Sequence, residues 1–100
     1  MSINNFMQQN INHLRNDIIS ELESEFNSHD FIKKIAKRFE PDYVDFLNKY
    51  RGSDAFRTVN SQIAKFLADN ALSLNIHKTQ KVKSENVFGE IDEIQGWKKN

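Results

Sequence analysis

Apolar side chains recur at helical spacing as far as Leu67, and after Asn70 they alternate with polar ones. Spacings of three and four place side chains on one face of a helix, whereas alternation is typical of a strand. The sequence therefore predicts a mainly helical α+β chain that ends in a β-hairpin. A long amphipathic helix is predicted over residues 3–26 from the apolar positions Ile3, Met7, Ile11, Leu14, Ile18, Leu22 and Phe26.

Three shorter helices are predicted next, over residues 30–39, 41–51 and 54–70. Pro41 separates the first two, because the residue before a proline avoids the helical region, and it suits the first turn of the next helix. Gly52 suits a helix end. Ser28 is the predicted N-cap of the helix at 30–39, and Ser53 or Asp54 that of the helix at 54–70.

The hairpin is predicted from strands at 74–83 and 87–91 that are joined by a turn at 84–86. In the tail that follows, Ile91, Ile94 and Trp97 are spaced by three, which leaves a final helical turn as an alternative. Trp97 is interpreted as a side chain packed on the core.

The order of three helices and a hairpin across residues 30–94 resembles that of a winged-helix DNA-binding domain. This resemblance implies a recognition helix at 54–70 and a wing at 74–94. It divides the chain into an N-terminal helix, 1–29, and a winged-helix-like domain, 30–100. That family's first short strand, between its first two helices, is not visible at Glu40-Pro41, so a plain helical domain with a hairpin is the alternative.

The predicted helix at 54–70 buries Phe56 with Val59, Ile63 and Phe66, and residues 55–68 contain no acidic side chain. Arg, Asn and Gln make bidentate contacts to base edges, and Ser or Thr contacts bases or phosphate. The predicted DNA-reading residues are Arg57, Thr58, Asn60, Ser61, Gln62 and Lys65. An ordinary solvated helix face is the competing interpretation.

Lysines in the predicted wing are candidates for contact with backbone phosphates. They are Lys78, Lys81 and Lys83. The alternative is that they protect an exposed sheet edge from pairing. A further basic cluster in the helix at 30–39 offers weaker phosphate candidates, namely Lys33, Lys34, Lys37 and Arg38.

The helix at 3–26 would extend about 36 Å at 1.5 Å per residue, longer than the helices beside it. Its stripe is therefore a predicted dimer interface, formed by Ile3, Met7, Ile11, Leu14, Ile18 and Leu22. The alternative is that the stripe covers the chain's own core.

The 100 residues carry 14 Lys and Arg against 14 Asp and Glu, so the net charge is zero. The charge is uneven, however: residues 1–29 sum to −3, residues 30–83 to +5 and residues 84–100 to −2. Neutrality therefore does not exclude a nucleic-acid partner, and it predicts a local, moderate electrostatic footprint.

The sequence offers no catalytic motif, and we expect neither an enzyme nor a cofactor. His13, His29 and His77 lack metal-ligand spacing, and the three glycines form no phosphate-binding loop. The carboxylates of Glu90 and its neighbours are interpreted as a solvated turn. The absence of Cys favours the cytoplasm, and no apolar run is long enough to span a bilayer.

These observations favour a small cytoplasmic protein that binds double-stranded DNA, with transcriptional regulation as one role and a homodimer as the expected state. The alternative hypothesis is a non-catalytic protein-interaction module, or an accessory subunit, that docks on a protein partner through the helix at 3–26.

Overall fold

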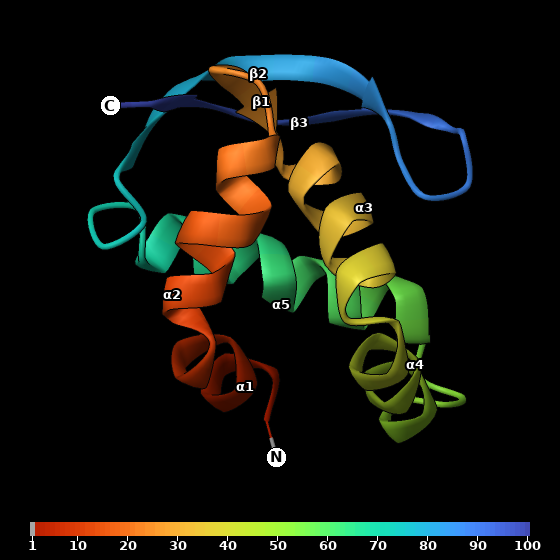
Figure 1. Ribbon diagram of the computed structural model, residues 1–100. Helices are drawn as coiled ribbons and strands as arrows, with labels where there is room; N and C mark the ends of the chain where they lie inside the picture. Colours follow the sequence, from red (N-terminus) through yellow and green to blue (C-terminus); the bar gives the residue numbers. More distant parts are fainter. Residues whose placement is uncertain (1) are drawn as a thin grey trace.

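The computed structural model describes residues 2–100 and has the α+β architecture predicted (Figure 1). Five α-helices precede a C-terminal antiparallel hairpin, which forms a three-stranded sheet with a short N-terminal strand. The sheet lies across one end of the helices, at the top of Figure 1. The elements are α1 (Ile3–Gln9), α2 (Ile11–His13), β1 (Glu25–Asn27), α3 (Ser28–Arg38), α4 (Glu40–Lys49), α5 (Ala55–Asp69), β2 (Ile76–Glu85) and β3 (Ile91–Lys99).

The N-terminal helical segment begins where Ser2 Oγ accepts a hydrogen bond from the Asn5 backbone N–H at 3.0 Å. It continues past α2 as a π-helical stretch, Leu14–Ile18, and a 3-10 turn, Ile19–Glu21. Apolar spacings of mostly four residues exceed the 3.6-residue turn, so an ideal stripe would drift around the helix. The wider π-helical turn compensates, and Leu14 and Ile18 both stay fully buried.

The predicted helix at 3–26 is wrong beyond Glu21, because the chain becomes extended at Leu22. Lys99 Nζ donates to the carbonyl oxygens of Ser20 and Leu22, so a side chain from the end of the sheet satisfies these helix-end groups. Phe26, predicted as helical, lies in β1 and is buried there against the core.

A capping box starts α3: Asn27 Oδ1 accepts from the Asp30 backbone N–H, and Asp30 Oδ2 accepts from the Asn27 backbone N–H, both at 3.0 Å. Asn27 is therefore the N-cap instead of Ser28, which is the first helical residue. Pro41 occupies the first turn of α4, as predicted. Gly52 adopts a φ of +82° in the turn before α5, where Asp54 stands at the N-cap position.

The strand order is β1-β3-β2, with both pairings antiparallel. The predicted turn at 84–86 and return strand at 87–91 are wrong, because residues 86–90 form the turn and β3 runs to Lys99. The ladder is irregular between Lys78 and Lys81. The extra residue lies in β2, where Thr79 and Gln80 stand opposite Gly96 alone. The final helical turn that was the alternative for Ile91, Ile94 and Trp97 does not form, because all three residues lie in β3.

One hydrophobic core draws side chains from both the predicted N-terminal segment, 1–29, and the predicted domain, 30–100. Trp97 is 1% exposed and lies in it, as predicted. Among residues 2–100, no helix is long and apolar enough to cross a membrane.

Candidate functional site

The polar face predicted on α5 is only partly free. Arg57, Ser61 and Lys65 recur every four residues and are exposed along one stripe of the helix. Lys65 Nζ lies 4.0 Å from a carboxylate oxygen of Asp69, in an exposed pair that contributes little to stability.

The remaining predicted DNA-reading residues are partly buried and bonded within the chain. The Tyr43 hydroxyl donates to Asn60 Oδ1 at 2.7 Å, and burial raises the pKa of Tyr43, so the hydroxyl remains a donor. Gln62 Nε2 donates to the Tyr50 hydroxyl oxygen at 3.2 Å. Thr58 Oγ1 donates to a backbone carbonyl oxygen of the preceding turn at 2.9 Å. These amides and this hydroxyl brace α5, which reduces their availability to bases.

The predicted wing lysines lie on an edge strand, because β2 pairs only with β3. Lys83 stands directly opposite Glu93, on the sheet face that points away from α3 and α5. Asp92, the next residue along, lies on the other face and points toward those helices. Lys81 shares the face of Lys83, so these two lysines do not gather with Arg57 on one surface. Lys78 lies beyond the irregularity of the ladder, opposite Trp97. An edge position and an irregular ladder also fit the alternative that they protect the sheet edge.

The basic cluster of α3 is placed beside acidic residues from the N-terminal segment. Glu21 accepts from Lys34 Nζ at 3.0 Å and lies 3.6 Å from Arg38 Nη1. These cations, chiefly the hydrogen bond from Lys34, lower the pKa of the Glu21 carboxyl. Lys98 and Glu25 form a further ion pair at 3.9 Å across the sheet. Lys33 and Lys37 line the same hollow as Glu21 and Glu25, so this face is electrically mixed.

The side chains of the predicted dimer interface are buried in the chain's own core. Ile3, Met7, Leu14 and Ile18 are at most 1% exposed, and Ile11 and Leu22 pack against the same core. In the folded chain this stripe does not present an open surface to a second molecule.

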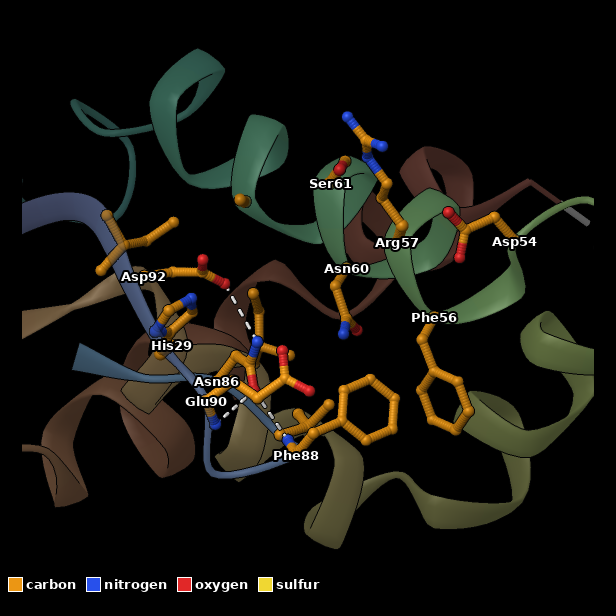
Figure 2. A pocket seen from close by; sticks show the side chains of 14 residues that line it. His29, Asp54, Phe56, Arg57, Asn60, Ser61, Asn86, Phe88, Glu90 and Asp92 are labelled. Carbon is orange, nitrogen blue, oxygen red and sulfur yellow. Dashed lines mark hydrogen bonds between the residues drawn. The ribbon is translucent and has the colours of Figure 1, made fainter. Parts of the chain in front are cut away.

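A groove of about 610 Å³ opens between α5, the start of α3 and the hairpin tip (Figure 2). This volume lies within the range of ligand-binding clefts. Apolar wall residues come from all three elements: Ile32 from α3, Ala64 from α5, and Val87 and Ile94 from the hairpin. Charged residues around it are Asp54, Arg57, Glu90 and Asp92.

An aromatic pair forms one edge of the groove. The rings of Phe56 and Phe88 meet edge to face, with centroids 4.9 Å apart and planes at 73°. Phe56 is nevertheless 40% exposed and Phe88 60% exposed, so the prediction that Phe56 is buried is wrong. The reason is that Phe56 lies in the first turn of α5, where its ring packs against Phe88 at the exposed tip of the hairpin. Figure 2 shows both rings beside Asn60 and Glu90 around one opening.

Asn86 fixes the shape of the hairpin tip. Its Oδ1 accepts from the backbone N–H groups of Phe88 at 2.9 Å and Glu90 at 3.1 Å. Its Nδ2 donates to Asp92 Oδ2 at 3.0 Å. Gly89 completes the turn at a φ of +77°, which favours glycine. One side chain thus orients an aromatic ring and two carboxylates, so this wall of the groove is formed before any ligand binds.

His29 forms the inner wall of the groove at the start of α3. It is 8% exposed, and its Nδ1 has no hydrogen-bond partner in the described chain. Burial is the main cause that lowers the pKa of His29, and nearby Asp92 opposes this effect only in part. The imidazole is therefore neutral at pH 7 and adds no positive charge to the groove.

The groove combines apolar walls, exposed aromatic rings and charged side chains, which are features of a binding site. Within residues 2–100, no group of three or more His, Cys, Asp or Glu side chains is placed to hold a metal ion. Comparisons of the chain with protein-family models, with curated proteins and with solved structures found no match.

Sequence reasoning missed this groove, although some of its parts carried signals. Asn86 and Gly89 are typical turn residues, and the apolar Phe88 between them is unusual for a solvated turn. Glu90 and Asp92 were predicted to be solvated, and they lie exposed at the rim of the groove. No local pattern indicates that Phe56 and His29 would join them.

Proposed function

We propose that this chain is a non-catalytic protein-interaction module that holds an extended segment of a partner protein in the groove between α5 and the hairpin tip. The observation that carries the proposal is the solvent-exposed pair of Phe56 and Phe88 at the edge of a preformed groove. Aromatic side chains dominate the binding energy of protein interfaces, and exposed apolar clusters mark interaction sites.

The polar groups of the groove suit a peptide backbone as well as side chains. Asn60 Oδ1 is occupied by the Tyr43 hydroxyl, which leaves the Asn60 Nδ2 hydrogens to donate to a peptide carbonyl. The tip fixed by Asn86 lowers the entropic cost of binding, because less of the wall must be ordered. The docking surface differs from the helix at 3–26 that the sequence suggested for such a module.

Selection of short peptides displayed on phage against the immobilised full chain tests this function. We expect enriched peptides to bind the wild type and to bind Phe88→Ser about tenfold or more weakly, as for an interface anchor. Leu72→Ser is the matched control, because Leu72 is 92% exposed and lies outside the groove. Failure to enrich any peptide, or equal loss of binding in both variants, would overturn the proposal.

Binding of double-stranded DNA is a second candidate function, and the exposed polar stripe of α5 favours it. The strand β1 lies before α3 and not between α3 and α4, where the resemblance implies the first strand of a winged helix, so this candidate rests on α5 and not on the topology. Arg57, Ser61 and Lys65 remain exposed on α5. The hairpin tip, residues 85–93, carries four carboxylates and no cation, so contact would come from α5 and not from the tip.

Fluorescence anisotropy with labelled duplex DNA at low salt tests this second function. We expect Arg57→Ala and Lys65→Ala each to weaken binding and to reduce the salt slope by about one if the side chain contacts a phosphate. The control is Lys83→Ala on the opposite sheet face. The absence of binding to long mixed-sequence duplex would refute this candidate and leave the peptide proposal untouched.

A further inference from the structure

We propose that the partner segment is cationic, with a lysine or arginine side chain seated between the Phe56–Phe88 pair and the carboxylates of the groove, and with aliphatic neighbours against its apolar wall. This inference rests on the proposed function, because it names the kind of segment that the groove takes. Three features of the groove support it independently.

The first feature is the charge of the groove. Asp54, Glu90 and Asp92 contribute three carboxylates, and Arg57 is the single cation among the lining residues. Among the described residues, these three carboxylates have no cationic group within 4.0 Å, whereas Glu21 and Glu25 do. Carboxylates without cations leave a negative field that a cleft with apolar walls strengthens.

The second feature is the aromatic pair. A ring face attracts an ammonium or guanidinium group within about 6 Å, and Arg and Lys stems also pack on apolar surfaces. Phe88 is 60% exposed, and Figure 2 places the Glu90 carboxylate on the same side of the opening as its ring. An aromatic ring beside a carboxylate offers one cation two favourable contacts.

The third feature is the His29 ring in the inner wall. Burial lowers the pKa of His29, so the imidazole is neutral and does not repel a cation. Its Nδ1 is buried, so the side chain takes part in the groove through its ring surface and not through that atom. A phosphate or an acidic segment would instead meet three carboxylates beside the single cation Arg57, so the groove itself disfavours a polyanion.

Binding of defined synthetic peptides to the full chain tests the inference by fluorescence anisotropy. The probe is a short fluorescein-labelled peptide that alternates lysine with leucine, and its partners carry glutamate or serine in place of lysine. We expect only the lysine peptide to bind. Its affinity falls as KCl rises from about 0.05 to about 0.5 M, because screening weakens exposed charge pairs.

Two charge-matched double variants locate the site. Asp54→Asn with Glu90→Gln removes two charges at the groove, and we expect the lysine peptide to bind about fivefold more weakly. Asn suits position 54, where φ is +53°, and neither carboxylate accepts a side-chain hydrogen bond in the described chain. Glu85→Gln with Glu93→Gln removes two charges on the opposite face of the hairpin and leaves the affinity within about twofold.

Equal binding of the serine or glutamate peptide would overturn the cationic inference while the proposed function survives. Equal weakening by both double variants would overturn it as well, since binding would then follow net charge alone. Self-association in sedimentation that Phe88→Ser abolishes would assign the groove to a second copy of the chain and would also overturn it. If no peptide binds and display enriches none, the proposed function itself fails.

Discussion

The buried hydrogen bond between Trp97 and Ser28 connects the hairpin to α3, and its removal gives a sharp test of how the groove is held in shape. Trp97 Nε1 donates to Ser28 Oγ at 2.9 Å, and both residues are 1% exposed. Ser28 is the first residue of α3 and Trp97 lies near the end of β3, so the bond fixes two of the three elements that border the groove.

Ser28→Ala would leave the indole N–H buried without a partner, which costs about 1–3 kcal/mol of unfolding free energy. Trp97→Phe would remove the donor and part of a core side chain. Its cost in unfolding free energy should be smaller than the ~3–5 kcal/mol of a truncation to alanine. In the Trp97→Phe background no donor is left unsatisfied, so Ser28→Ala should cost about 0.5 kcal/mol or less. The double-mutant cycle therefore predicts a coupling energy of about 0.5–3 kcal/mol.

Urea unfolding followed by far-UV circular dichroism measures all four proteins, because Trp97 is the only tryptophan and its fluorescence is lost in two of them. A loss of 1 kcal/mol corresponds to a fall in Tm of about 4–8 °C for a domain of this size. If Ser28→Ala leaves the midpoint unchanged, or if the two substitutions are additive, the bond does not hold the hairpin to α3.

Two further predictions concern the same elements. Gly96→Ala should destabilise the fold by about 2–3 kcal/mol in urea unfolding, because the added Cβ would lie 2.6 Å from Thr79 Oγ1 and 2.7 Å from the Gln80 backbone oxygen. Rescue of the stability by Thr79→Ala would contradict this reasoning, since the contact with the Gln80 backbone remains in that variant. The lowered pKa of His29 means that the unfolded chain binds this proton more tightly than the folded chain, so stability should fall as the pH drops through 6.5 and toward the folded pKa. Urea midpoints measured from about pH 8 to about pH 5 should show a smaller fall for His29→Gln than for the wild type, and parallel curves would refute this role.

Local sequence patterns predicted the helices well because the residues that begin and end a helix act on their immediate neighbours in the chain. Pro41, Gly52 and Asp54 mark boundaries in α4 and α5 within about two residues of the predicted ones. The prediction at 22–26 failed because Lys99, far along the chain, binds the carbonyl oxygens where the helix ends. Helical spacing in the sequence cannot indicate such a partner.

The hairpin shows a similar limit. Val87 and Phe88 have strand propensity, yet Asn86 accepts two backbone hydrogen bonds and folds them into the turn. The spacing of Ile94 and Trp97 left a helical turn open, whereas pairing with β1 and β2, which are distant in the sequence, makes this segment a strand. The hairpin tip forms one wall of the candidate groove, and its conformation was predicted wrongly. The groove therefore could not be predicted from the sequence pattern.

The uneven charge along the chain also has a different meaning once the chain is folded. A cationic middle between acidic ends suggested a surface for DNA, but folding brings Glu21 to Lys34 and Arg38, and Glu25 to Lys98. Glu21 therefore neutralises part of the positive charge of residues 30–83, and the Glu25–Lys98 pair joins the two acidic ends of the chain. The carboxylates of Glu90 and Asp92 are held at the hairpin tip, where no cation lies within 4.0 Å of them among the described residues, and they border a groove with exposed aromatic rings. Because unneutralised charge beside apolar surface is what a charged partner recognises, the fold shifts the expected partner from a polyanion toward a cationic peptide.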